Sequence, residues 1–309
     1  MGNFRRPRIA SALLGGMLRG MEDTNDKIVP RDYFIESIKA EMESSTPSRR
    51  RRIFDAIALA ALGSIPWLGG VIAAASTAVA SYQAGEAEAE KERLLKEWLQ
   101  EHQDRLQKLR ATLELIVLRL EGFGKEIDER IHSEQYLALV RKTFRQWDQA
   151  DTEEKRRLLV SLIMNAAGTR VCSDDIVRLF LDWIDRYHES HFAVIREIYK
   201  QTDDPPTRYD IWVAVYGEPV PRDDSPEADL FRMLISDLNI GRVIRLPRET
   251  DYQGRFKRRV RPPRHPSSVT LESAFEDSKP WVLTGLGSQF VHYTMTELVR
   301  QIQSGTKEK

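Results

Sequence analysis

The chain has 309 residues, a length that allows two or three domains. Its 47 Lys and Arg residues balance 47 Asp and Glu residues, so the whole chain is not a polycation suited to coating nucleic acid or an anionic membrane. The single cysteine, Cys172, excludes an intramolecular disulfide and a cysteine-rich zinc module. The N-terminus fits neither a secretory signal nor a myristoylation motif, and these features together predict a cytoplasmic protein.

Residues 1–52 are polar and basic, and they predict a leader with one short amphipathic helix over 33–42. The leader ends in four consecutive arginines at 49–52. Such a run suits an anionic lipid surface, and it is equally typical of a solvated flank.

The most unusual segment is 56–85, which has 30 consecutive residues without a charge. Ten of them are alanine, and Pro66 lies near paired glycines in the middle, where a helix is expected to break. We expect two short helical arms joined by a turn over 63–70, each too short for a ~30 Å hydrocarbon core. The alternatives are a buried hairpin, a single span kinked at Pro66, and a hairpin that meets a membrane only after a trigger. The candidate membrane residues are Ile65, Trp67, Leu68, Val71 and Ile72.

A charged helix with a long apolar seam follows. From Leu95 to Ile127, steps of four and three residues meet an apolar side chain at nine of ten positions, which predicts a coiled coil or a long helical hairpin. So amphipathic a helix needs a partner, either a return helix over 134–149 or a second copy of the chain. The candidate oligomerisation residues are Leu106, Leu109, Leu113, Ile116 and Leu120.

The remaining sequence predicts a helical block and then a winged-helix module. In the block, Asp151 and Ser173 stand where N-cap residues are expected. The module shows the order helix, helix, strand, long loop, strand, helix, which resembles a winged helix-turn-helix. The predicted fold is mainly α, with an Ala/Gly hairpin, coiled-coil-like helices, a helical block and a C-terminal winged-helix (α+β) module. The predicted domains are 1–52, 53–150, 151–204 and 205–309.

Two neighbouring parts of the module, a helix and the loop after it, differ in the sign of their charge. The helix over 226–239, which displays Leu230 among its apolar residues, carries three acids and only Arg232, a poor match for DNA phosphates. The loop beyond it has nine cations and two acids over 242–264, so it is either a polyanion-binding patch or a solvated mobile loop. The candidate polyanion-binding residues are Arg255, Lys257, Arg258, Arg259 and Arg261.

No catalytic motif is evident, so we expect neither an enzyme nor a cofactor. The nearest approach to a metal site is a set of acids and histidines at a helix join. Their spacing places them on one helical face, which we interpret as its solvated side. These residues are Asp182, Asp185, His188 and His191.

Three stretches in this order, EEKRRLLVSLIMNAAG, DDIVRLFLDWIDRYHESHFAVIREI, and the ending with DLNIGRVIRL and VLTGLGSQFV, resemble the abortive-infection alpha family of bacterial proteins over about residues 150–295. The resemblance implies a role in defence against phage and carries no catalytic residues. We therefore expect a non-enzymatic interaction or effector protein that binds itself or a protein partner and takes no small-molecule substrate. If the hairpin acts, the protein would also be peripheral to, or inserted in, the inner membrane. The alternatives are a nucleic-acid-binding regulator that uses the basic loop, and a soluble scaffold.

Overall fold

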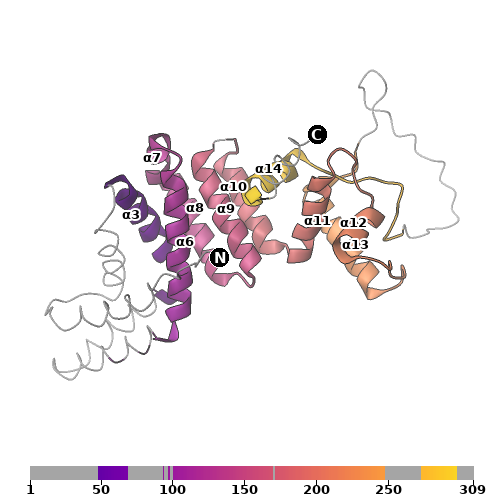
Figure 1. Cartoon of the computed structure of the whole chain (residues 1–309), viewed down its shortest axis with the longest axis horizontal. Coiled ribbons are helices and arrows are strands. Elements are labelled where there is room, and N and C mark those ends of the chain that lie inside the picture. Colours follow the sequence, from indigo (N-terminus) through magenta and orange to yellow (C-terminus); the bar gives the residue numbers. More distant parts are fainter. Residues whose placement is uncertain are drawn as a thin grey trace, which may run out of the picture. The chain divides into compact units, whose positions relative to one another are not determined.

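The computed structural model of the chain is mainly helical, as predicted, and its described part contains one two-stranded sheet (Figure 1). The chain divides into two compact units, Met1–Arg145 and Gln146–Lys309. The residues that the structure describes are 48–68, 93, 97, 100–169, 171–247 and 273–297.

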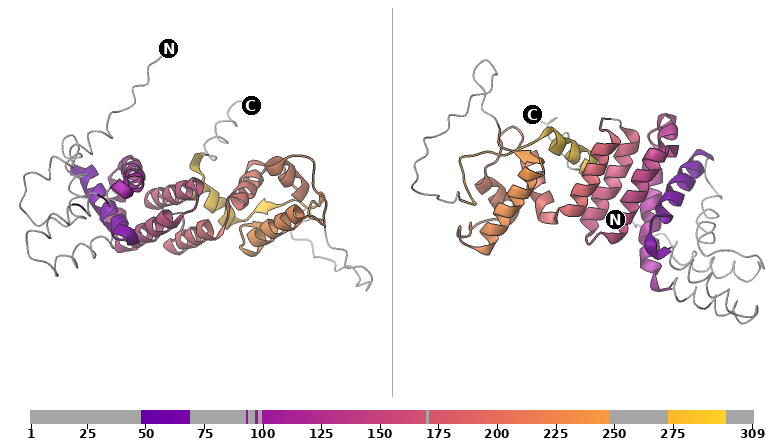
Figure 2. Two further views of the ribbon diagram at one scale, coloured as in Figure 1. Left: turned by 90° about the horizontal axis from the view of Figure 1, so that it is seen from below. Right: turned by 180° about the vertical axis from the view of Figure 1, so that it is seen from behind.

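Unit 1 is built on α3 (Ser48–Leu62), which packs on α6 (Gln103–Glu121), as Figure 1 and Figure 2 show. The helix begins eight residues before the uncharged segment, so the four arginines belong to α3 and not to a polar leader that ends at residue 52. Arginine is a good helix former, which explains the early start. The apolar side chains of α3, among them Ile53, Phe54 and Ile57, are buried.

The end of α6 differs from the prediction of one helix through Ile127. The helix stops at Glu121, and Gly124 adopts a φ of 80°, a left-handed conformation that glycine accepts readily. A short 3-10 turn, η1 (Lys125–Ile127), and α7 (Asp128–His132) follow. The apolar seam of the sequence therefore continues past the end of the helix, because Ile127 is still buried.

The return helix is found where it was predicted, as α8 (Glu134–Gln149). Its N-terminus is capped by Ser133, whose hydroxyl accepts a hydrogen bond from the backbone N–H of Tyr136. The five side chains predicted to form its inner face are all buried: Tyr136, Val140, Thr143, Phe144 and Trp147.

Three helices open unit 2: α9 (Glu153–Gly168), α10 (Asp174–Arg186) and α11 (Glu189–Lys200). Ser173 caps α10 as expected. The cap of α9 is Thr152, not Asp151, because the Thr152 hydroxyl accepts from the backbone N–H of Lys155. Asp151 instead lies 3.3 Å from the Lys155 ammonium group.

The C-terminal elements have the predicted order but no separate core. They are α12 (Arg208–Tyr216), α13 (Pro226–Ile240), β1 (Ile244–Arg245), β2 (Val282–Leu283) and α14 (Gly285–Thr294). The strands pair antiparallel, with Ile244 opposite Leu283. Both α9 and α11 pack on α14, so elements from the two sides of residue 204 are in contact within unit 2.

The contact between α9 and α14 joins parts of unit 2 that are far apart in sequence. The Asn165 amide donates hydrogen bonds to the Tyr293 carbonyl at 2.8 Å and to the Thr296 hydroxyl at 2.9 Å. The Tyr293 hydroxyl accepts from Thr169 at 2.8 Å and from the backbone N–H of Cys172 at 3.1 Å. These polar contacts border an aromatic core in which Phe180 lies against Trp183, Phe290 and Tyr293.

Candidate interaction surface

The membrane candidates that the structure describes belong to unit 1 and pack within it. Ile65 is buried, and Trp67 and Leu68 are partly buried. The Trp67 ring stacks on His102, with 5.0 Å between the ring centroids. Val71 and Ile72 lie outside the described residues. Within the described ranges, no helix combines the length and the apolar character needed to cross a membrane. Of the five candidates, Ile65 is therefore the one that the structure shows fully buried.

Of the arginines at 49–52, Arg51 and Arg52 are exposed, whereas Arg49 is bound at the end of α6. Its guanidinium donates to the Asp128 carboxylate at 2.9 and 3.0 Å and to the Glu121 carbonyl at 3.0 Å. It also donates to the Gly124 carbonyl. These contacts, above all the hydrogen bond from Arg49, hold the pKa of Asp128 below its ordinary value. Arg49 therefore fastens α3 to the C-terminal end of α6 and to the turn that follows it.

The predicted oligomerisation residues are already covered within one chain. The most exposed of the five retains 7% of its surface, because α3 packs on α6. Of the two partners that the sequence left open, one within the chain therefore covers the described part of this seam. The exposed large apolar residues of α6 are instead Leu115 and Leu118, at 52% and 59%. The covered residues are Leu106, Leu109, Leu113, Ile116 and Leu120.

The polyanion-binding candidates lie outside the described residues. The structure describes the start of the basic stretch, where Arg242 and Arg245 are exposed on either side of the first strand residue. Arg242 adopts a φ of 61°, which turns the chain from α13 into β1. The candidates concerned are Arg255, Lys257, Arg258, Arg259 and Arg261.

The acids and histidines considered as metal ligands do not share one environment. Asp182, Asp185 and His188 are exposed, but His191 is only 2% exposed, so the prediction of a solvated position is wrong for this histidine. Among the described residues, no group of His, Cys, Asp or Glu side chains is arranged to hold a metal ion.

His191 has a structural role at the start of α11. Its Nδ1 accepts a hydrogen bond from the backbone N–H of His188 at 3.1 Å, so we assign the proton of the neutral ring to Nε2. Nε2 faces the Asp237 carboxylate at 3.7 Å, and the ring stacks on Tyr187. Burial lowers the pKa of His191, and the nearby Asp237 opposes this only in part. The ring is therefore neutral at neutral pH and leaves the charge of Asp237 uncompensated.

An unexpected apolar surface lies on the outside of α13. Leu230, Met233 and Ile240 are 49%, 46% and 74% exposed. Leu230 is among the apolar residues that the sequence places on this helix, and the structure leaves it exposed while the next residue, Phe231, is buried. We define the α13 outer face as Leu230, Met233, Asp237 and Ile240.

Acidic residues border the α13 outer face. Glu227 and Asp229 are exposed in the first turn of the helix, and the pKa of Glu227 is lowered by hydrogen bonds from its own backbone and from Ser225. The only cation within α13, Arg232, is already bound. It donates to the Asp223 carboxylate at 3.1 Å and to that of Asp229 at 2.9 Å.

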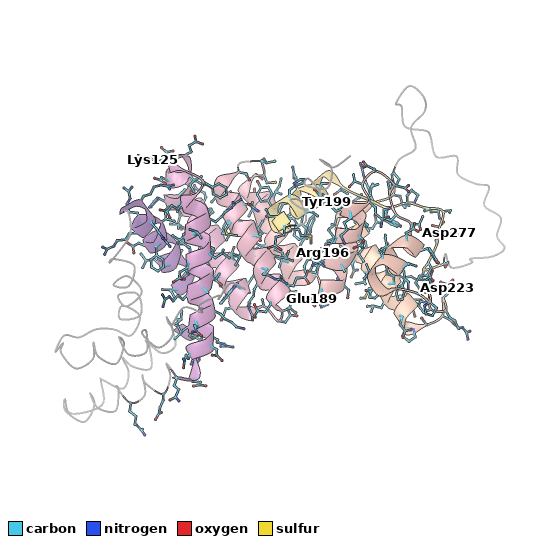
Figure 3. The ribbon with its side chains drawn as sticks, in the orientation of Figure 1. Lys125, Glu189, Arg196, Tyr199, Asp223 and Asp277 are labelled. Atoms are coloured by element: carbon cyan, nitrogen blue, oxygen red, sulfur yellow. The ribbon has the colours of Figure 1, made fainter. Side chains whose placement is uncertain are left out.

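Asp223 also holds the base of α13 in place (Figure 3). Its carboxylate accepts from the hydroxyl of Ser273 at 3.0 Å and from the backbone N–H of Ala274 at 2.8 Å, beyond the long loop. With Arg232 on the same carboxylate, α13 is tied to the segment that leads into β2. The helix thus presents its outer face from a fixed position.

Burial raises the pKa of the Cys172 thiol, which disfavours the thiolate that a nucleophilic cysteine needs.

Comparison with models of protein families, with curated proteins and with solved structures finds nothing that matches this chain. The function is therefore argued from the chemistry of the chain's own surfaces.

Proposed function

We propose that this chain is a non-enzymatic interaction protein whose unit 2 docks a protein partner. The observation that carries the proposal is the α13 outer face, where three large apolar side chains are exposed on a helix that also bears acids. A cluster of exposed apolar side chains on one helix is typical of a binding surface.

The charge of α13 opposes its use as a DNA-reading helix. Glu227, Asp229 and Asp237 are all exposed, and Arg232 is bound to Asp223. A helix that enters the major groove must approach phosphates, which repel carboxylates. If the C-terminal elements form a winged helix, this helix is suited to protein and not to base pairs.

The proposed biological setting is bacterial defence against phage. It rests on the resemblance of residues 150–295 to abortive-infection alpha proteins, in which the chain would act as an effector or as a sensor that docks a partner. A defence role of this kind needs binding and no chemistry on a substrate, which agrees with an interaction surface as the principal feature of unit 2.

A plating assay tests the proposal. Bacteria that express the full chain are challenged with a panel of phages, and we expect fewer plaques than in cells with empty vector. The double variant Leu230→Glu with Met233→Glu should restore plaque formation, whereas Leu118→Glu, an equally exposed position on α6, should retain protection. Absence of protection by the wild-type chain overturns the defence role, and protection by the double variant overturns the role of the α13 outer face.

A second candidate function is polyanion binding through the basic loop. It is favoured by the nine cations and two acids over 242–264, of which Arg242 and Arg245 are seen exposed. It predicts binding of duplex DNA or RNA that falls steeply with salt and weakens when Lys257, Arg258 and Arg259 are all changed to Glu. Binding that ignores this triple change would count against it.

Membrane insertion of the 56–85 hairpin would first have to separate α3 from α6. Flotation with anionic liposomes at low and high salt tests this alternative, because an inserted hairpin stays bound at high salt and a merely electrostatic contact does not. Charged substitutions at Trp67 and Leu68 should abolish salt-resistant flotation if insertion occurs.

A further inference from the structure

We infer that the α13 outer face pairs with a basic amphipathic helix of another protein, in the manner of a short coiled coil. This inference rests on the proposed function, since it assumes that α13 docks a protein, and it adds the chemistry and the shape of that partner.

The spacing of the exposed residues is that of a heptad seam. Leu230, Met233, Asp237 and Ile240 are separated by three, four and three residues, the a–d–a–d pattern of a helix that packs against a second helix. At 100° per residue they lie within about 80° of one another around the helix axis, so one partner helix can contact all four. Their exposure shows that none of the residues that the structure describes covers this seam along α13.

The acids occupy the positions that determine the choice of partner. With Leu230 as an a position, Glu227 is an e position and Asp229 is a g position, on opposite sides of the seam. Both side chains are exposed, and Asp229 also accepts a hydrogen bond from Arg232 of the same helix. Charges at e and g decide which helices pair, so acids here favour Lys and Arg on the facing helix.

Asp237 makes the requirement for a cation stronger. It stands at an a position between two apolar d positions, and its side chain is 47% exposed. The neighbouring His191 is neutral at neutral pH and does not cancel its charge. A partner that covers Asp237 with an apolar side chain would bury an unpaired carboxylate, whereas a facing Lys or Arg supplies the opposite charge.

The same charges exclude the competing occupants. Nucleic acid and anionic lipid present phosphates, which carboxylates repel. A second copy of this chain would bring up a face with the same three acids, and in a parallel pair the two Asp237 side chains would meet, so self-pairing through this face is opposed. The remaining occupant is a helix with apolar residues at heptad spacing, a Lys or Arg at one central a position, and cations along its edges.

The test uses the full chain and two synthetic three-heptad peptides with Leu at the other seam positions. The basic probe has Lys at its central a position and at e and g, and the acidic probe has Glu at all of these. Fluorescence anisotropy should show the basic probe binding at least about tenfold more tightly than the acidic probe. Leu230→Glu and Met233→Glu should each weaken binding at least about tenfold, and Leu118→Glu should not.

Charge reversal at Asp237 separates a specific pair from general attraction. Asp237→Lys should lower affinity for the basic probe, and a third probe with Glu only at the central a position should recover it, as in a double-mutant cycle. Far-UV circular dichroism and the thermal midpoint confirm that each variant is folded. The inference is overturned if neither probe binds, if binding ignores Met233→Glu, or if the central charge makes no difference.

The plating assay and the peptide-binding measurement can give opposite outcomes, which distinguishes the proposed function from this inference. If the α13 variants lose protection in the plating assay but peptide affinity ignores charge, the docking function stands and the basic partner is wrong. If the basic probe binds as expected but the wild-type chain gives no protection, the surface is right and the defence role is wrong.

Discussion

Replacing Arg49 should loosen α3 from α6 more than any change at the neighbouring arginines. Arg49→Ala removes hydrogen bonds to Asp128, Glu121 and Gly124 together. The side chain is 17% exposed, so most of the contact is shielded from water. The Asp128 carboxylate and the carbonyls of Glu121 and Gly124 then lose the hydrogen bonds from Arg49.

The size of the effect follows from these contacts. A hydrogen bond to a charged group contributes about 1.5–3 kcal/mol, but water can reach the partly exposed Asp128 carboxylate and replace some of what is lost. We therefore expect the free energy of local opening of α3 to fall by about 2–3 kcal/mol in total. Where amide exchange follows the opening equilibrium, this corresponds to ~30- to 150-fold faster exchange. Arg49→Lys keeps a charge but cannot reach three acceptors from one planar group, so its effect should be intermediate.

Hydrogen exchange measured by mass spectrometry on peptides from Ser48–Leu62 gives the local readout. Arg52→Ala is the matched control, because Arg52 is exposed on the same helix and acts on Asp128 only through its charge. Since the pKa of Asp128 is lowered in the folded state, its contribution is present above its ordinary pKa and is lost as pH falls through the folded value. Equal exchange in Arg49→Ala and Arg52→Ala would refute the assigned role of Arg49.

Three further substitutions test the described contacts. Leu113→Ala should lower the free energy of unfolding by about 2–5 kcal/mol in urea denaturation, because Leu113 is fully buried. Leu118→Ala, on the same helix but exposed, should change it by less than ~0.5 kcal/mol, and equal losses would show that the seam is not filled. The pKa of His191 is lowered in the folded state, so the unfolded state binds more protons, and the free energy of unfolding should fall as pH drops below about 6.5. His191→Gln should show a shallower decline, and identical pH profiles of the two proteins would contradict the buried neutral ring. Gly287→Ala should lower the thermal midpoint, because its Cβ would lie 2.2 Å from the Val243 carbonyl oxygen. Gly285→Ala meets nothing within 4 Å and should be neutral or stabilising, so similar midpoints of the two variants would argue against the close approach of α14 to Val243.

The features that the sequence predicted well depend on local signals. The bounds of α8 follow from one clear apolar face, and the start of α10 follows from Ser173 and the acids behind it. The order of the last two strands and α14 follows from apolar runs separated by turn residues. Each of these signals lies within a few residues of the element it determines.

The errors concern contacts between distant residues. A heptad seam shows that Leu109 and Leu113 need a partner, but it does not say which helix supplies it, and α3 does so within the chain. The residue type of His191 is compatible with solvent, and its environment includes Asp237 of α13, which is 46 residues away in sequence, as well as the nearby Tyr187.

The α13 outer face was missed for a related reason. The helix carries apolar residues around much of its circumference, so periodicity alone leaves its inward direction ambiguous. Packing inside unit 2 decides the matter: Phe231 is buried against Trp212 and Phe275, and Leu230 and Met233 are left outside. The three-four-three spacing from Leu230 to Ile240 was the signal that would have found this face.

The hydrogen bonds between α9 and α14 have a consequence for how the protein is made. Asn165 and the Tyr293 carbonyl are separated by 128 residues, and a ribosome adds about 5–20 residues each second, so α9 waits roughly 6–25 s for its partner. During that interval the apolar side of α9, which α14 later helps to cover, is open to chaperones and to other nascent chains. Unit 2 therefore completes its fold late in synthesis, and a chain released before α14 is made would retain an uncovered α9.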